Sequence, residues 1–305
     1  EKVDFELGLA SRADLTYRDN LGAVSMILNN AGELNTYSTG GFGALSTATR
    51  DQINALRNNN TDWGKELYQS AINQQYTLGL QGGTEQANYY FSGGYYNERG
   101  TTIGTGLKRY NATLKTDFMV SSKLKFGAAL FGAVTNQKNY LTETSAFTNP
   151  SRYVRNVNPY LTPRDANGAY IYDPDIQGAT NLTGDVFVPF TILEERNNSR
   201  YNLNSKSFKG IFDVNYKIIK DLNFRSELGL QFEENGSEKY GSADTYYVRK
   251  FREGTRYFNS ATKKYEYFLP QGGVIQNQNT SFFQYNWKNI FEYNKVINEK
   301  HEIEA

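Results

Sequence analysis

Residues 107–135 alternate between apolar and polar side chains, the pattern of two β-strands whose faces meet different surroundings. Phe131 breaks this pattern, and Ser121 with Ser122 is predicted to turn the chain. Strands of about 14 residues exceed the usual 5–6 and suit a membrane-spanning barrel, where about 9–11 residues cross the hydrocarbon. The apolar face carries Tyr110, Ala112, Leu114, Thr116, Phe118 and Val120 in the first strand, and Leu124, Phe126, Ala128, Leu130, Gly132 and Val134 in the second.

The same alternation recurs along the chain. In residues 1–10 it places Val3, Phe5, Leu7 and Leu9 on one face. Together with the pair at 107–135, about nine strands are therefore predicted. The other segments predicted as strands are 76–81, 89–95, 208–218, 222–232 and 283–293, and a further strand begins at 301–305.

Short and long connections alternate between the predicted strands. Outer-membrane barrels have short periplasmic turns and longer extracellular loops. We therefore predict an all-β fold over 1–305, a partial antiparallel transmembrane β-barrel with short helices in its extracellular loops; a soluble β-protein is the alternative. The short turns lie near 83–86, 121–122, 220–221 and 298–299, and the long loops at about 11–72, 137–205 and 236–277, with a Gly-rich loop at 97–106.

Two short helices are expected in the first long loop. Thr49 and Gln52 have the spacing of a capping box just before Ile53. Asp62 can cap a second helical turn, in which Trp63 and Leu67 fall on one face.

Composition is compatible with a barrel and excludes several classes of function. Aromatic residues make up 15% of the 305 residues, which fits aromatic girdles and also fits a carbohydrate-binding β-protein. The net charge of +1 argues against a nucleic-acid binder. Because the chain has no Cys and a single His, His301, no disulfide framework or thiolate metal site is possible and a His-based triad is implausible. Residues 1–9 do not resemble a signal peptide, so a mature chain or a fragment is expected.

No catalytic constellation stands out, and we predict no cofactor and no metal. Glu194 and Glu195 are adjacent, so on extended backbone their side chains point in opposite directions and form a poor acid pair. Asp165 and Asn167 resemble the start of a Ca²⁺ loop, but Ile176 stands where the twelfth-position Glu is needed, so a turn is favoured.

Aromatic residues in the long loops are the candidates for ligand binding. Their rings can stack on sugar rings or contact a protein partner, although aromatic residues also dominate core packing. The candidates are Trp63, Tyr153, Tyr160, Tyr170, Tyr172, Tyr246, Tyr247 and Tyr257.

Several stretches of the chain carry motifs of one known family. Thr61-Asp62-Trp63 precedes Glu66-Leu67-Tyr68, and YTLGLQGGTE at 76–85 precedes NYYFSGGYY at 88–96. Gly100 is followed by KRYNA at 108–112, and Lys300-His301 stands near the end. As a set, these stretches resemble the SusC/RagA family of TonB-dependent transporters, most densely over 61–136.

The resemblance implies a 22-stranded barrel in the outer membrane of a Gram-negative bacterium, filled by an N-terminal plug. It also implies import of a large nutrient, an oligosaccharide more than a peptide, with energy from the proton gradient through TonB. A SusD-like surface lipoprotein and outer-membrane lipid are the implied partners. We find no plug, TonB box or C-terminal half, so the chain is expected to cover roughly the first nine strands. The alternatives are a secreted glycan-binding protein and an adhesive or passive-pore outer-membrane protein; none of these is an enzyme.

Overall fold

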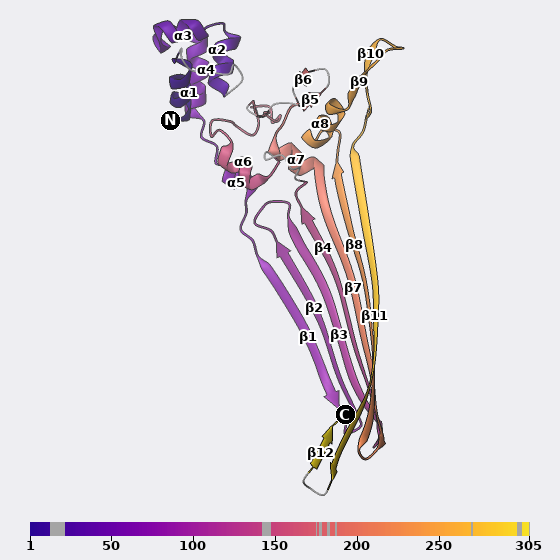
Figure 1. The fold of residues 1–305 in the computed structure, drawn as a ribbon. Coiled ribbons are helices and arrows are strands. Elements are labelled where there is room, and N and C mark those ends of the chain that lie inside the picture. Colours follow the sequence, from indigo (N-terminus) through magenta and orange to yellow (C-terminus); the bar gives the residue numbers. More distant parts are fainter. Residues whose placement is uncertain are drawn as a thin grey trace. The chain divides into compact units, whose positions relative to one another are not determined.

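A computed structural model describes residues 1–12, 22–141, 148–174, 176, 179–181, 184–186, 188–269, 271–297 and 301–304 (Figure 1). Contacts between residues divide the chain into two compact units. The long strands form the sheet unit, which comprises Ser70–Asn139, Tyr201–Glu238 and Gln276–Ala305. The segment before the first long strand and the two longest connections form the loop unit, which comprises Glu1–Gln69, Tyr140–Arg200 and Lys239–Ile275.

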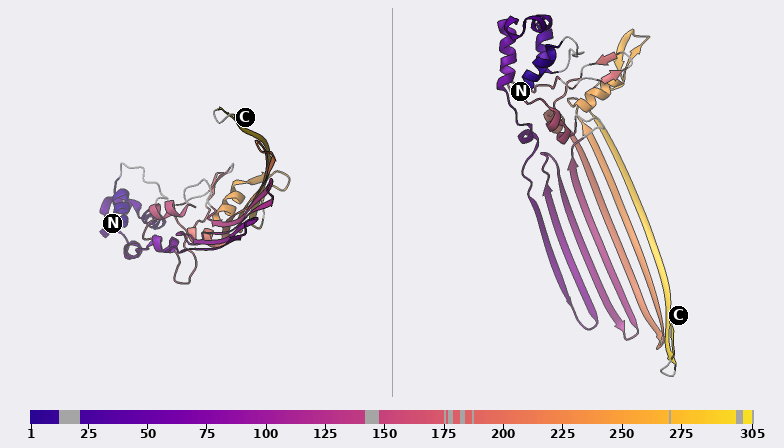
Figure 2. Two further views of the ribbon diagram at one scale, coloured as in Figure 1. Left: turned by 90° about the horizontal axis from the view of Figure 1, so that it is seen from below. Right: turned by 60° about the vertical axis from the view of Figure 1, so that its left-hand side comes forward.

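Within the described residues, the sheet unit is one eight-stranded sheet in the order β1-β2-β3-β4-β7-β8-β11-β12. The pairs from β1 to β7 and the pair β11–β12 are antiparallel. The sheet curves when seen along its strands, as a section of barrel wall does (Figure 2). Its strands are β1 Asn73–Gly83, β2 Ala87–Arg99, β3 Gly106–Ser121, β4 Leu124–Asn139, β7 Ser199–Ile219, β8 Leu222–Gly241, β11 Val274–Ile297 and β12 His301–Glu304.

The strand register assembles the alternating residues into two continuous faces. Leu80 pairs with Phe91, Phe91 with Leu114, and Leu114 with Leu130, so these four side chains form one row of an apolar face. Lys115 lies on the opposite, polar face, and its Nζ is 5.8 Å from the centre of the Phe131 ring. This cation–π contact gives a physical reason for an aromatic residue on the polar face.

The strands continue beyond the ends predicted from the sequence. β4 ends at Asn139 and β7 begins at Ser199, inside the loop predicted at 137–205. Apolar alternation stops where the residues become polar, but backbone hydrogen bonding does not require apolar side chains. The connections are short at 84–86, 122–123 and 220–221, and long at 140–198 and 242–273. The turn predicted near 298–299 lies outside the described residues.

The strand predicted at 1–10 is wrong, because Lys2–Ala10 forms helix α1. Val3, Glu6, Leu7 and Ala10 are buried on one side of it, whereas Phe5 is 59% exposed. Positions i, i+3, i+4 and i+7 share a helix face. A segment this short is compatible with both the two-residue period of a strand and the 3.6-residue period of a helix. Packing of its buried side chains selects the helix. The sheet therefore has eight strands in the described residues, not about nine.

The loop unit consists of short helices and two hairpins. The cap predicted at Asp62 is confirmed, since Lys65 N donates to Asp62 Oδ1 at 3.2 Å. The cap predicted at Thr49 is wrong: Ser46 caps α4, and Thr49 N donates to Ser46 Oγ at 3.3 Å. No helix among the described residues is long and apolar enough to cross a membrane. The elements are α1, α2 Ala23–Asn30, α3 Leu34–Gly40, η1 Phe42–Ala44, α4 Thr47–Asn58, α5 Trp63–Leu67, α6 Pro150–Asn156, α7 Ile192–Asn198, α8 Tyr246–Gly254, and strands β5 Ala179–Asn181, β6 Gly184–Val186, β9 Arg256–Asn259 and β10 Lys264–Tyr267.

Candidate ligand pocket in the loop unit

A buried glutamate on α1 joins the N-terminal helices to a distant segment. Glu6 is 3% exposed; its Oε2 accepts from Val24 N at 3.3 Å, and its Oε1 accepts from the Tyr160 hydroxyl at 2.8 Å. Ala23 N donates to the same Tyr160 oxygen at 3.0 Å. The Glu6 carboxylate thus satisfies the N–H of Val24, and the Tyr160 hydroxyl satisfies that of Ala23, both at the start of α2. Gly22 is required beside it, because its φ is +84° and a Cβ would lie 2.5 Å from the carboxylate.

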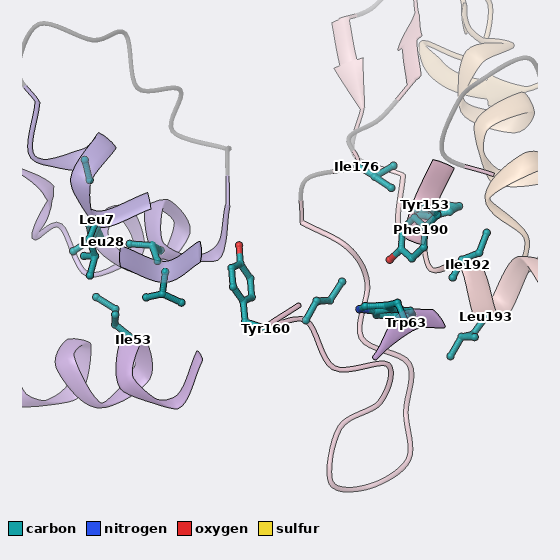
Figure 3. Packing of buried hydrophobic residues seen from close by; sticks show 14 of the residues in the cluster. Leu7, Leu28, Ile53, Trp63, Tyr153, Tyr160, Ile176, Phe190, Ile192 and Leu193 are labelled. Carbon is teal, nitrogen blue, oxygen red and sulfur yellow. The ribbon is translucent and has the colours of Figure 1, made fainter. Parts of the chain in front are cut away.

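A chain of aromatic rings packs within the loop unit, and Figure 3 labels three of them, Trp63, Tyr153 and Phe190. Trp63 contacts Tyr153 edge-on at 5.3 Å, Tyr153 contacts Phe190 at 5.6 Å, and Phe190 contacts Tyr246 at 5.2 Å between ring centres. The four rings are at most 3% exposed. Such edge-to-face pairs stabilise a core beyond simple burial. They connect α5, α6 and α8, which come from three separate parts of the sequence.

A second buried glutamate joins α7 to α8. Glu195 is 2% exposed, and its Oε1 accepts from Tyr246 N at the start of α8. Burial raises the pKa of Glu195 to about 7, although backbone N–H groups of Tyr246 and Tyr247 and the nearby Arg249 act in the opposite direction. Its neighbour Glu194 pairs with Arg249. The sequence-based expectation of extended backbone here is wrong, since both glutamates lie on a helix.

A pocket of about 400 Å³ lies between α2, α4 and the segment 160–174. Its wall is mostly aliphatic, with carboxamide groups among the apolar side chains. Apolar walls with a few polar groups are typical of small-molecule and peptide-side-chain sites. The lining residues are Ala23, Met26, Ile27, Asn30, Gln52, Leu56, Asn59, Tyr160, Leu161, Thr162, Ile171, Tyr172 and Pro174.

The structure distributes the eight predicted ligand residues over three environments. Trp63, Tyr153 and Tyr246 are buried in the ring chain, where they pack the core. Tyr160 and Tyr172 line the pocket; Tyr172 is 37% exposed. The remaining three lie elsewhere: Tyr170 stacks on Arg164 at 4.0 Å, Tyr247 is half-buried at the start of α8, and the exposed Tyr257 donates to Glu266 Oε2 at 3.0 Å.

Sequence reasoning missed most of the pocket wall. Met26 and Leu56 belong to helices whose apolar positions serve the core as well. The only sequence signal is that these helices have an apolar face, which predicts burial and not a cavity. The pocket requires segments separated by more than a hundred positions, as the 137 positions between Ala23 and Tyr160 illustrate.

The Asp165 loop is a turn, as predicted. Asp165 Oδ1 accepts from Asn167 N at 2.9 Å and from Ala169 N at 2.8 Å, and Gly168 has a φ of +83°. The carboxylate therefore closes its own backbone turn. Among the described residues, no group of three or more His, Asp or Glu side chains is arranged to hold a metal ion.

The sheet, with one apolar and one polar face, defines the wall of a transmembrane β-barrel. No protein-family model matches the chain. A TonB-dependent receptor of Formosa agariphila is 24% identical over 93% of this chain, and the TonB-dependent receptor SusC of Bacteroides thetaiotaomicron is 23% identical over 71%. A structure of the RagAB peptide transporter matches 98% of the chain with a TM-score of 0.62 and 19% identity, and therefore supports the fold.

These similarities agree with the resemblance seen in the sequence: the chain is similar to SusC and other TonB-dependent receptors, which are outer-membrane β-barrel proteins of Gram-negative bacteria. It spans 25% of the Formosa relative, 22% of SusC and 30% of the matched RagAB chain. The relatives are named as receptors and transporters, not as enzymes.

Proposed function

We propose that this chain forms part of a TonB-dependent outer-membrane transporter that imports a large nutrient with energy from the proton-motive force. The observation that carries the proposal is the one-sided apolar sheet, whose long connections all leave from one end, together with similarity to TonB-dependent receptors. A SusD-like surface lipoprotein is the proposed partner at the loops, and TonB is the proposed source of energy.

The pocket favours a peptide as cargo, with an oligosaccharide as the alternative. Sugar binding requires open aromatic faces and many hydrogen-bonding groups, whereas this wall is mainly aliphatic around Met26, Ile27 and Leu56. An apolar peptide side chain fits such a wall, and the carboxamides of Asn30 and Gln52 can bond a peptide backbone. We therefore propose a peptide in place of the oligosaccharide that the family resemblance implied.

Filling the pocket is expected to impair uptake. In cells expressing the native transporter, Met26→Trp should raise the half-saturation concentration for a labelled peptide mixture about tenfold, because the indole occupies the volume of a bound side chain. Asp51→Trp adds the same ring at an exposed position of α4 outside the pocket and should leave uptake unchanged. Labelled oligosaccharides, tested in parallel, decide between the two cargo classes.

The energy source separates transport from the rival functions. A protonophore should abolish uptake by the wild-type protein; uptake that continues identifies a passive pore. Absence of uptake for both cargo classes, with the protein present in the outer membrane, rejects the transporter proposal and leaves an adhesive role.

Cysteine labelling is expected to place the long connections outside the cell. The chain has no Cys, so a single Ala166→Cys, at an exposed position of the connection 140–198, gives a clean site. A membrane-impermeant maleimide should label it on intact cells. Ser122→Cys, in the turn between β3 and β4, should be labelled only after permeabilisation. The reverse result would overturn the proposed orientation.

A further inference from the structure

An apolar groove of about 330 Å³ runs along the apolar face of β3, β4 and β7. It exists because small residues are neighbours in one row of the sheet: Gly93 pairs with Ala112, and Ala112 pairs with Gly132. The bulky Phe208, which pairs with Gly132, closes this row on β7. A Cβ added to Gly132 would have no heavy atom within 4 Å. Tyr110, Val134 and Phe232 complete the walls. The groove is thus open to solvent or lipid along one side and has room for a slender apolar chain.

A polar pocket of about 310 Å³ adjoins this groove and shares Val134 and Lys206 with it. Its other lining residues are Asn136, Asn204, Ser205, Glu234, Gly236 and Asn279. Lys206 Nζ lies 3.4 Å from Glu234 Oε1, and both side chains are about half exposed, at 59% and 43%. One ammonium, one carboxylate and several carboxamides offer both donors and acceptors to a bound group.

The apolar groove and the polar pocket follow each other along the strands, as the acyl chain and the headgroup follow each other in a lipid. Going along β4, Gly132 lies in the groove, Val134 is shared, and Asn136 lies in the polar pocket. On the antiparallel strand β7, their partners are Phe208, Lys206 and Asn204 in the same order. Lys206 lines both cavities, and its ammonium lies beside Glu234 of the polar pocket, as expected of a lysine at a membrane interface, which keeps its charged head at the polar end. β4 then leads into the long connection 140–198.

We propose that these adjoining cavities bind one phosphorylated glycolipid of the outer leaflet, with an acyl chain in the groove and its headgroup in the polar pocket. Lys206 complements a phosphate, while Glu234 and the carboxamides of Asn136, Asn204 and Asn279 hydrogen-bond sugar hydroxyls. The carboxylate disfavours a headgroup that offers phosphate alone, which is why a sugar-bearing lipid fits better. The choice of leaflet rests on the proposed function, in which the long connections are extracellular.

The test is stoichiometric lipid binding by the native outer-membrane protein in mild detergent, with purified lipid A as the probe and native mass spectrometry as the readout. The wild-type protein should retain one lipid A per chain. Gly132→Leu should abolish this, because its side chain extends into the groove from a position where a Cβ has free space. Lys206→Gln should weaken binding about tenfold through loss of a charge-assisted contact. Ala128→Leu, which adds the same bulk to the same face of β4, and Lys209→Gln, on the polar face of β7, should bind as wild type.

Equal retention by Gly132→Leu and Ala128→Leu would show non-specific lipid contact only and overturn the proposal. Tighter binding of phosphatidylethanolamine or of dephosphorylated lipid A overturns the headgroup assignment. Lipid binding is measured without cargo and without TonB, so the two proposals are tested independently. A protein that binds lipid A but imports no cargo would contradict the transport proposal and leave the lipid site supported.

Discussion

Phe91→Lys is expected to destabilise the barrel by about 2–4 kcal/mol, the cost of a lysine near the middle of the lipid face of a barrel. Phe91 pairs with Leu80 and Leu114 in the middle of the apolar face. Ser92→Lys places the same charge one residue later, on the polar face, where Ser92 pairs with Gly79 and Thr113. That variant is expected to change stability by less than about 1 kcal/mol.

Urea unfolding of the native protein reconstituted in lipid vesicles measures both variants, and their amounts in the outer membrane give an independent readout. Because the two positions are adjacent on β2, their side chains lie on opposite faces of the sheet but at nearly the same depth in the membrane. Equal destabilisation by the two lysines would contradict the assignment of the apolar face to lipid.

Raising the pH is expected to loosen the junction between α7 and α8. The pKa of Glu195 in the folded chain is about 7, against a usual value of 4.5. A raised carboxyl pKa favours the folded state while the group is protonated, so its full contribution is present below about pH 4.5 and is lost as the pH rises through about 7. At pH 8 the ionised, buried carboxylate should cost about 3 kcal/mol relative to pH 4.

Hydrogen exchange at the amides of α8, corrected for intrinsic rates, measures this local opening in the native protein. Protection should fall between pH 5 and pH 8 in the wild type and stay constant in Glu195→Gln, which keeps an acceptor for Tyr246 N but cannot ionise. Glu195→Ala should reduce protection at every pH, because it leaves N–H groups at the start of α8 without this partner. A wild-type profile that does not change with pH would refute the assignment.

The strands were predictable because their alternation has one dominant cause. A face that meets lipid must be apolar at every second position, and this signal survives across β2, β3, β4 and β7. The apolar alternation ends where the strands leave the lipid. The polar ends of β4 and β7, at Asn139 and Ser199, therefore carried no hydrophobic signal from which they could be predicted. Residues 1–10 satisfied the strand period equally well, and their packing against α2, α3 and α4 selects the helix.

The candidate pocket was far less predictable. Tyr160 and Tyr172 were identified as loop aromatics, but nothing in the sequence distinguishes them from Trp63 or Tyr153, which pack the core. The distinction depends on which segments meet. Glu6 lies on α1 but accepts from a backbone N–H of α2, and Glu195 lies on α7 but accepts from a backbone N–H of α8. Such contacts between different helices have no local sequence signature.

The discontinuous loop unit has a consequence for folding kinetics. Its three segments are separated by strands β1–β4 and by strands β7–β8, and the bond between Tyr160 and Glu6 spans 154 positions. Contacts of such high sequence separation form slowly, because chain entropy is lost before the contacts return stability. The hairpins β1–β2 and β3–β4, in contrast, close through tight turns. The loop unit and its pocket are therefore expected to be the last part of the chain to fold, after the strands that separate its segments have paired.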